Sequence, residues 1–312
     1  MQYRRLGRTG LKVSEVGLGC NNFGMRLDAP GTLEVVSAAI DQGITLFDTA
    51  DIYGNTRSET FLGAALGARR QQVVVATKFG LPVGKSALER GGSRRYIHCA
   101  VEASLKRLNT DYIDLYQIHM PDPDTPIEET LDALTDLVRA GKVRYTGCCN
   151  FSAWQIADAD WTARSGQALR FATAQNAYSL LDRGVEREVL PACERYGLGF
   201  LPYFPLASGM LTGKYRRGAQ RPAGARLENP EPWAEHFLAD RNFERVERLE
   251  QFAQARGHGL LDLAFGWLLA QPLVASVIAG ATSAEQVAAN AAAGGWRLSA
   301  AEFSEAGTLA GN

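Results

Sequence analysis

The stretch Thr45-Leu46-Phe47-Asp48-Thr49-Ala50 decides the fold, together with the residues that follow it. Its apolar residues are dense enough for a strand that is buried on both faces. An amphipathic segment follows over Glu59–Leu66, and then a second apolar run over Val73–Lys78. Strand, helix and strand in this order predict a βαβ unit, in which the two strands are parallel.

The same alternation continues almost to the end of the chain. It predicts strands near Glu15–Gly19, Thr45–Thr49, Val73–Lys78, Ile113–His119, Arg144–Cys149, Phe171–Gln175, Gly199–Tyr203 and Ala275–Ile278. It predicts helices over Leu33–Asp41, Glu59–Leu66, Arg94–Leu108, Ile127–Ala140, Ala153–Thr162, Val185–Tyr196, Phe243–Arg256 and Ala284–Ala292. A hairpin over Tyr3–Val16, turning at Thr9-Gly10, comes before them.

Eight strand and helix pairs predict a closed (β/α)8 TIM barrel of the α/β class. No linker-like change of composition divides the chain, so we expect residues 1–312 to form one domain. A doubly wound sheet is the alternative, but it needs a switch of topology that the even spacing does not indicate. The segment Arg216–Asp240 is too long for a passive connection, which indicates a functional loop.

Composition excludes several classes of function. With 33 Lys and Arg against 34 Asp and Glu, the chain has no basic field for nucleic acid. The most apolar window, Leu260–Ala270, is interrupted by Asp262 and is too short to span a membrane. The absence of a secretory signal predicts a cytoplasmic location. The 5 cysteines have no C-x-x-C spacing, so we expect reduced thiols.

Familiar ligand-binding motifs are also missing. The run Gly17–Asn22 fails the G-x-G-x-x-G pattern at its last position, which disfavours a Rossmann pocket. The four histidines are scattered and form no H-E-x-x-H, so no metal site is expected.

Four polar residues fall at or just after the carboxyl ends of neighbouring predicted strands, where barrel enzymes place their working groups: Asp48, Tyr53, Lys78 and His119. Each alone has an ordinary structural interpretation as a cap, a loop aromatic, a solvated cation or a core histidine. Their coincidence favours one shared pocket, because adjacent strands lie about 4.8 Å apart.

This grouping has a chemical logic. A neighbouring ammonium favours phenolate, so Lys78 is expected to lower the pKa of Tyr53 and make it a usable acid and base. Asp48 would hold Lys78, and His119 could orient a carbonyl oxygen by a hydrogen bond. The set suits interconversion of carbonyl compounds and alcohols.

At these residues the sequence resembles the aldo-keto reductase superfamily over nearly the whole chain. The segment Gly43–Ala50 with Tyr53-Gly54, then Ala76-Thr77-Lys78 and the His119 strand, carries the likeness. Within the superfamily, the residues of these motifs resemble those of bacterial reductases and potassium-channel β subunits more than those of mammalian aldose reductases. The resemblance implies a catalytic tetrad of Asp48, Tyr53, Lys78 and His119.

The resemblance also implies a site for NADPH or NADP. Its expected residues are Asn150 and Gln175 at the carboxamide, Tyr203 under the ring, Pro205, Leu206, Ala207, Ser208, Gly209 and Lys214 at the pyrophosphate, Arg226 at the 2′-phosphate, and Gly280, Thr282, Gln286 and Asn290 at the adenosine. Cys149 stands where serine is usual, a weaker hydrogen-bond donor. Gly280-Ala281 replaces the Lys-Ser of many relatives, so phosphate recognition rests on Arg226 and NADH stays open as an alternative.

Small carbonyl or alcohol molecules are the expected partners, with neither nucleic acid nor a membrane, and assembly into a homo-oligomer stays open. The substrate wall is expected from residues of top-face loops: Asn21, Asn22, Phe23, Arg26 and Met120, with the aromatics Trp154, Trp233 and Phe237. Three alternatives to a reductase remain at this point. They are a redox-sensing subunit with little turnover, a sugar or alcohol dehydrogenase working in the oxidative direction, and a Schiff-base lyase that uses Lys78 as its nucleophile.

Overall fold

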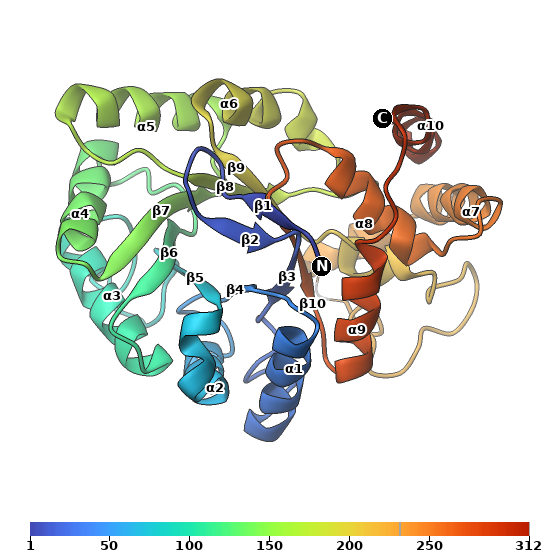
Figure 1. Ribbon diagram of the computed structural model, residues 1–312, viewed down its shortest axis with the longest axis horizontal. Helices are drawn as coiled ribbons and strands as arrows, with labels where there is room; N and C mark the ends of the chain where they lie inside the picture. The colour runs from blue at the N-terminus through green and yellow to red at the C-terminus, as the bar shows by residue number, and fades with distance from the viewer. Residues whose placement is uncertain (231, 312) are drawn as a thin grey trace.

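Eight parallel strands form the centre of the computed structural model, which describes residues 1–230 and 232–311 without the side chain of Trp233 (Figure 1). They are β3 (Val16–Gly19), β4 (Leu46–Asp48), β5 (Val74–Phe79), β6 (Ile113–Ile118), β7 (Val143–Cys149), β8 (Thr173–Ala177), β9 (Gly199–Tyr203) and β10 (Val277–Gly280). Their order in the sheet is β10-β3-β4-β5-β6-β7-β8-β9. A bridge between Phe200 and Val274 brings the two edge strands together, so the barrel is nearly closed.

The register of the strands places their carboxyl ends at one rim. Gly19 pairs with Asp48, and Asp48 pairs with Ala76. On the next pair of strands, Lys78 pairs with Gln117. All six residues of β5 are buried, as expected for a strand covered on both faces. This register explains why polar side chains from different strands meet at the same end of the barrel.

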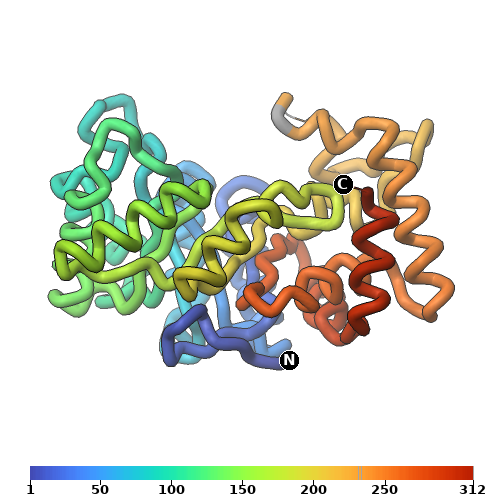
Figure 2. The backbone as a smooth tube through the Cα atoms, turned by 90° about the horizontal axis from the view of Figure 1, so that it is seen from above, coloured from blue at the N-terminus to red at the C-terminus, as the bar shows by residue number. Residues whose placement is uncertain are grey.

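A hairpin of β1 (Tyr3–Arg5) and β2 (Lys12–Ser14) covers the opposite end. In Figure 1 it lies across the centre of the ring of strands, and in Figure 2 it lies at one edge of the molecule. Leu6 and Val13 from the hairpin pack into the inner core with Leu46, Leu115 and Leu201. Burial of such side chains stabilises the fold by about 1.5 to 3 kcal/mol each. The hairpin therefore seals this end with apolar side chains.

Helices surround the strands in the order in which the chain supplies them (Figure 1). They are α1 (Ala29–Asp41), α2 (Arg57–Leu66), α3 (Arg94–Leu108), α4 (Ile127–Arg139), α5 (Ala153–Gly166), α6 (Val189–Tyr196), α7 (Asp240–Gln254), α8 (Leu260–Ala270), α9 (Ala284–Ala293) and α10 (Ala300–Ala310). Short 3₁₀ segments are η1 (Gly67–Gln72), η2 (Gly184–Glu186), η3 (Ala207–Thr212) and η4 (Pro232–Leu238). Within the described ranges, none of the helices has the length and hydropathy that crossing a membrane requires.

Helices α1 and α6 differ most from the sequence prediction at their first turns, by four residues each. Helix α1 begins four residues earlier than expected, at Ala29, because the Asp28 side chain accepts a hydrogen bond from Gly31 N and caps it. The predicted helix Val185–Tyr196 was wrong at its start, since η2 ends at Glu186 and α6 begins at Val189. Pro191 explains this, because proline is tolerated in a first turn but breaks a helix interior.

Two helices were missed altogether. Helix α8 is the apolar window that was considered only as a membrane span, and eight of its residues are buried. Helix α10 follows Ser299, whose hydroxyl accepts from Glu302 N while the Glu302 carboxylate accepts from Ser299 N. This Ser-x-x-Glu pattern is a capping box, so the start of α10 could have been predicted from the sequence. Helix α8 packs against β10 and α9, whereas α10 packs against α7 and α8.

Strand limits differ from the predicted ones by up to two residues. The sixth and eighth predicted strands differ most, and β8 is Thr173–Ala177 rather than Phe171–Gln175. Similarly, β10 is Val277–Gly280 rather than Ala275–Ile278. Strands buried on both faces lack the alternation that would mark their ends. The five cysteines are free thiols, in agreement with the expectation.

Candidate active site

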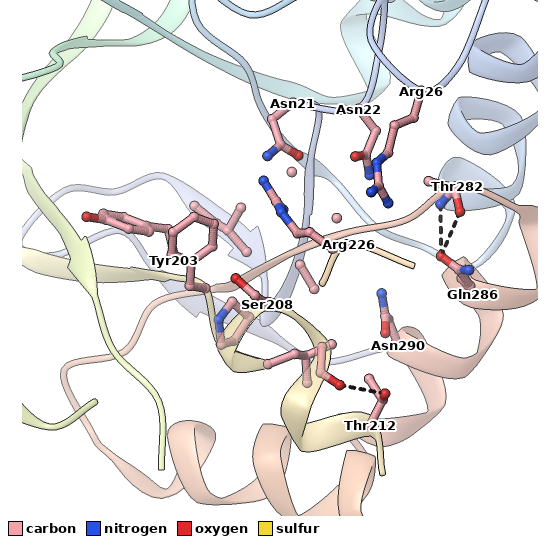
Figure 3. Close-up of a pocket in the computed structure, with 18 of the residues that line it drawn as sticks. Asn21, Asn22, Arg26, Tyr203, Ser208, Thr212, Arg226, Thr282, Gln286 and Asn290 are labelled. Atoms are coloured by element: carbon pink, nitrogen blue, oxygen red, sulfur yellow. Dashed lines mark hydrogen bonds between the residues drawn. The ribbon is translucent and has the colours of Figure 1, made fainter. Parts of the chain in front are cut away.

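A cavity of about 860 Å³ opens at the rim where the strands end (Figure 3). Its walls come from the carboxyl ends of the strands, the β3–α1 loop and the Pro222–Arg226 part of the long loop. Most of the residues predicted for a site line it: Asn21, Asn22, Arg26, Asp48, Tyr53, His119, Asn150, Gln175, Tyr203, Pro205, Leu206, Ser208, Gly209, Lys214, Arg226, Gly280, Thr282, Gln286 and Asn290. The fold thus gathers residues that lie up to 269 positions apart in the sequence, from Asn21 to Asn290.

The four residues expected to act together do meet at one end of this cavity. Lys78 Nζ donates to Asp48 Oδ2 at 2.6 Å and to Thr49 O at 2.8 Å. The same nitrogen lies 5.1 Å from the centre of the Tyr53 ring. Tyr53 and His119 meet edge to face, with ring centroids 5.7 Å apart. Lys78 is fully buried beneath the cavity and does not itself line it.

The proton affinity of Tyr53 differs from the sequence prediction. Burial raises the pKa of Tyr53 to about 12, and the Lys78 ammonium offsets only part of that increase. Lys78 therefore acts in the expected direction, but the expected net decrease in the Tyr53 pKa is wrong in this structure. The cause is desolvation, which penalises the phenolate more than one neighbouring cation stabilises it.

Lys78 stays charged in spite of its burial. Desolvation alone would lower its pKa, but the contact with Asp48 outweighs that effect and leaves the pKa above its ordinary value. For His119, burial and the nearby Lys78 charge act together and lower its pKa to about 3. The imidazole is therefore neutral at physiological pH. A neutral imidazole next to an ammonium can donate one hydrogen bond to an oxygen without carrying charge itself.

Two amide side chains expected at the carboxamide have protein partners. Gln175 Nε2 donates to Asp48 Oδ1 at 2.9 Å. Asn150 Nδ2 donates to His119 O at 3.0 Å, while its Oδ1 accepts from Tyr203 OH at 2.7 Å. These bonds fix the orientation of both amides. They also connect β7, β8 and β9 to the residues around Lys78.

The loops after β7 and β9 hold strained backbone conformations. Asn150, Phe204, Ala207 and Ser208 have φ between +46° and +61°, a region that residues other than glycine rarely adopt. Such conformations cost about 1 to 3 kcal/mol each and concentrate at ligand-binding sites. Ser208 Oγ is buried and has no hydrogen-bond partner in the described part of the chain. An unpaired buried hydroxyl facing a cavity is a donor available to a ligand.

Arg26 and Arg226 point into the cavity near Ser208 (Figure 3), and Lys214 lines the same cavity. Arg26 donates to Gly224 O at 3.4 Å, and the Arg226 guanidinium lies 5.2 Å from the centre of the Phe204 ring. Burial lowers the pKa of Arg226 and of Lys214, and Arg26 lowers both further by repulsion. A cluster of like charges at a cavity is relieved when an anion binds between them. Arg26, predicted for the substrate wall, thus lines the same cavity as Lys214 and Arg226 and lies close enough to act on the charge of both.

The far end of the cavity is formed by the start of α9. Thr282 N and Oγ1 both donate to Gln286 Oε1, and Asn290 lies one turn further along the helix (Figure 3). Asn22 Nδ2 donates to Ala281 O at 3.1 Å and fixes the β3–α1 loop against this end. A Cβ on Gly280 would lie 3.2 Å from Asn22 Nδ2, so the missing side chain lets the loops approach.

Several predicted site residues lie elsewhere. Phe23 and Ala207 are fully buried in the apolar core, and neither lines the cavity. Met120 is 42% exposed and Trp154 is 68% exposed, and neither lines the cavity. Phe237 does not line the cavity either, but it packs edge to face against Phe204, which does. The side chain of Trp233 lies outside the described residues.

Some lining residues were missed by sequence reasoning. Cys20 and Met25 follow β3, Phe204 and Thr212 follow β9, and Pro222–Ala225 come from the long loop. The length of the long loop predicted a functional role without saying which residues carry it. Phe204 stands between Tyr203 and Pro205, so its position after a strand was the signal available.

The model of the aldo/keto reductase family matches residues 15–309. The chain belongs to this family. A probable voltage-gated potassium channel subunit beta from Oryza sativa subsp. japonica is 40% identical over 93% of this chain and 90% of the relative. The aldo-keto reductase YhdN from Bacillus subtilis is 37% identical over 100% of this chain and 94% of the relative. The L-glyceraldehyde 3-phosphate reductase from Escherichia coli is 32% identical over 93% and 86%. The family and its oxidoreductase-named members support oxidoreductase chemistry.

Proposed function

We propose that this aldo/keto reductase family member interconverts aldehydes or ketones and alcohols, with Tyr53 as the general acid and base and NADP(H) as the cofactor. The observation that carries this proposal is the arrangement of Asp48, Lys78, Tyr53 and His119 at one end of a long cavity whose middle is lined by three cationic side chains. A nicotinamide cofactor supplies or accepts the hydride when bound. The protein residues provide the proton and the orientation.

Tyr53 donates its hydroxyl proton to the developing alkoxide of a carbonyl substrate. The Lys78 ammonium stabilises the resulting phenolate, and Asp48 holds Lys78 in place at 2.6 Å. Neutral His119 donates a hydrogen bond to the same substrate oxygen and fixes its direction. Burial of Lys78 keeps water from competing for its contact with Asp48.

The cavity fits a dinucleotide with phosphate groups. Its length runs from His119 to Asn290, and its middle carries Arg26, Lys214 and Arg226 beside the unpaired Ser208 hydroxyl. Guanidinium groups pair well with phosphate oxygens. Asn150 and Gln175 would position a carboxamide, Tyr203 would support a flat ring, and Gln286 and Asn290 would contact the adenosine. The cations favour a 2′-phosphate, and hence NADP(H) over NAD(H).

The variant Tyr53→Phe tests the proton donor. Carbonyl reduction should fall about 100-fold or more, because the phenolic proton is lost while the ring is kept. NADPH binding, followed by fluorescence, should stay within about twofold of wild type. Tyr3→Phe, at a half-exposed hairpin residue, is the matched control and should behave as wild type. A Tyr53→Phe enzyme that keeps more than about a tenth of wild-type turnover contradicts the assignment.

A second candidate is a cofactor-binding, redox-sensing subunit with little turnover. The similarity to the rice protein named as a probable channel subunit favours it. A panel of aldehydes, ketones, sugars and quinones, assayed in both directions, separates the two. Steady-state rates of about 1 to 1,000 per second support the enzyme, and rates far below that with intact NADPH binding support the subunit. The same panel tells a reductase from a sugar or alcohol dehydrogenase.

A further inference from the structure

A buried carboxyl group lies behind the turn that carries Tyr53. Asp51 follows β4, its backbone N donates to Lys78 O at 3.1 Å, and Tyr53 N closes the turn by donating to Ala50 O at 3.2 Å. Asp48 and Tyr53 line the cavity, whereas Asp51 does not, and its side chain is only 1% exposed. The same short turn therefore presents Tyr53 to the ligand and Asp51 to the interior.

The Asp51 carboxyl group has few hydrogen-bond partners. Its Oδ2 accepts a long hydrogen bond of 3.4 Å from Tyr96 OH on α3. Its Oδ1 is buried and has no partner among the described residues, and the same is true of the Tyr116 hydroxyl on β6. A buried carboxylate without partners is costly, whereas a protonated carboxyl group carries no charge and can donate.

The buried charges around the turn do not balance. Lys78 is already paired with Asp48, and Arg107 on α3 is paired with Glu59 on α2 at 2.6 Å. Asp51 is a further carboxyl group close to the Glu59–Arg107 pair, and no second cation offsets it among the described residues that act on it. Tyr96 and Tyr116 are the other titratable groups that face it. Burial raises the pKa of Asp51 to about 7, and the Glu59 charge adds to the increase more than Arg107 relieves it.

We propose that Asp51 is a positioning residue for Tyr53: the neutral carboxyl group holds the Ala50–Tyr53 turn in its packed form, and ionisation draws the turn toward water and withdraws the Tyr53 hydroxyl from the reacting oxygen. Proton loss is the only chemical change, from the Asp51 carboxyl to solvent. This rests on the proposed function, because the readout of position is proton donation by Tyr53.

The pH profile of turnover isolates this effect. The pKa of His119 is about 3 and that of Tyr53 is about 12, so neither changes charge between pH 6 and 8.5. Wild-type kcat for carbonyl reduction should fall about 10-fold or more across that range, with a midpoint near pH 7. Asp51→Asn keeps the shape but cannot ionise, so its profile should be flat. Asp158→Asn, at an exposed residue of α5, should keep the wild-type profile.

Tyr96→Phe provides a second variant in case the first does not fold. It removes a hydrogen bond that favours the charged form of Asp51, so the midpoint should move to higher pH. A merely structural role would lower kcat at every pH and leave the midpoint where it is. Coincident profiles of wild type, Asp51→Asn and Tyr96→Phe overturn the proposal.

Urea denaturation tests Asp51 without any turnover. Between pH 6 and 8.5 the unfolding equilibrium constant of wild type should increase about 10-fold relative to Asp51→Asn, because only the wild type loses a proton that the fold holds. If no substrate is turned over but this difference appears, the reductase proposal fails and the ionisation of Asp51 stands. An equal pH response of the two proteins removes the basis for the positioning role.

Discussion

Lys78 is the residue on which the site depends most, because it is fully buried and is bonded to both Asp48 and Thr49. Replacing Lys78 with Met keeps the aliphatic stem but leaves the Asp48 carboxylate without its cation. Breaking a buried pair in this way costs about 3 to 5 kcal/mol. We expect a corresponding loss in the free energy of unfolding, measured with urea.

The same variant tests the coupling to Tyr53. Without the ammonium the phenolate is less stable, so the pH optimum of alcohol oxidation should move to higher pH and the rate should fall. Lys106→Met on the exposed side of α3 is the matched control and should change neither quantity. An unaltered optimum in Lys78→Met would mean that the two residues titrate independently.

Arg226 is the residue expected to recognise the 2′-phosphate. A charge-assisted hydrogen bond contributes about 1.5 to 3 kcal/mol, so Arg226→Ala should raise the dissociation constant of NADPH about 10-fold or more and hardly change that of NADH. Arg221→Ala, on the exposed part of the same loop, is the control. Equal losses for the two cofactors, titrated by fluorescence, would move phosphate recognition to Arg26 or Lys214.

Individual residues also show what the sequence could predict. Asp48, Lys78 and His119 were identified because they end or adjoin buried strands, and parallel strands end at one rim. The pKa of Tyr53 was mispredicted because its sign depends on how much water the fold removes, and no local pattern contains that quantity. Phe23 and Met120 were misplaced because the direction of a loop side chain is set by packing between distant segments.

At the scale of elements, the η3 loop after β9 combines backbone strain with an unpaired hydroxyl at Ser208. Ser208→Gly removes both, since glycine adopts φ near 56° without a steric penalty. The free protein should become more stable by about 1 kcal/mol, while NADPH binding weakens severalfold. Ser208→Ala removes the hydroxyl alone and should weaken binding without the full gain in stability. Stability and affinity that rise together in Ser208→Gly would contradict a role of this loop in binding.

Most helices and strands could be predicted from the sequence, and the errors in the predicted helices have local causes. A proline at the third position of α6 marks a first turn, not an interior. Helix α8 was missed because a helix that is apolar on nearly every side lacks an amphipathic stripe. Periodicity therefore finds the elements that face both core and solvent, and it fails for those that are buried.

At the scale of the whole molecule, two buried groups give the stability opposite pH dependences. The pKa of His119 is lowered to about 3, so the unfolded chain binds its proton more readily and stability falls as the pH decreases below 6.5. The pKa of Asp51 is raised to about 7, so its contribution to stability increases as the pH decreases from 7 toward 4. The two contributions partly cancel in the wild type.

Replacing one of these two residues should reveal the pH dependence of stability that the other causes. Between pH 7 and pH 5, His119→Asn should gain about 2 kcal/mol in the free energy of unfolding relative to wild type, because it no longer resists protonation. Urea unfolding at the two pH values measures the difference. His98→Asn, on helix α3, is the control and should follow the wild type. The same pH response in His119→Asn and wild type would mean that His119 is protonated in the folded protein.

The hairpin that covers one end of the barrel has a consequence for the order of events during catalysis. Leu6 and Val13 close the inner core at that end, so the cavity formed by the described residues opens at the rim where the strands end. The residues expected to bind NADP(H) form the walls and floor of this opening. The molecule that binds deepest in the cavity must therefore bind first and dissociate last. The carbonyl or alcohol substrate then binds and leaves while the cofactor stays bound beneath it, so binding and release are ordered.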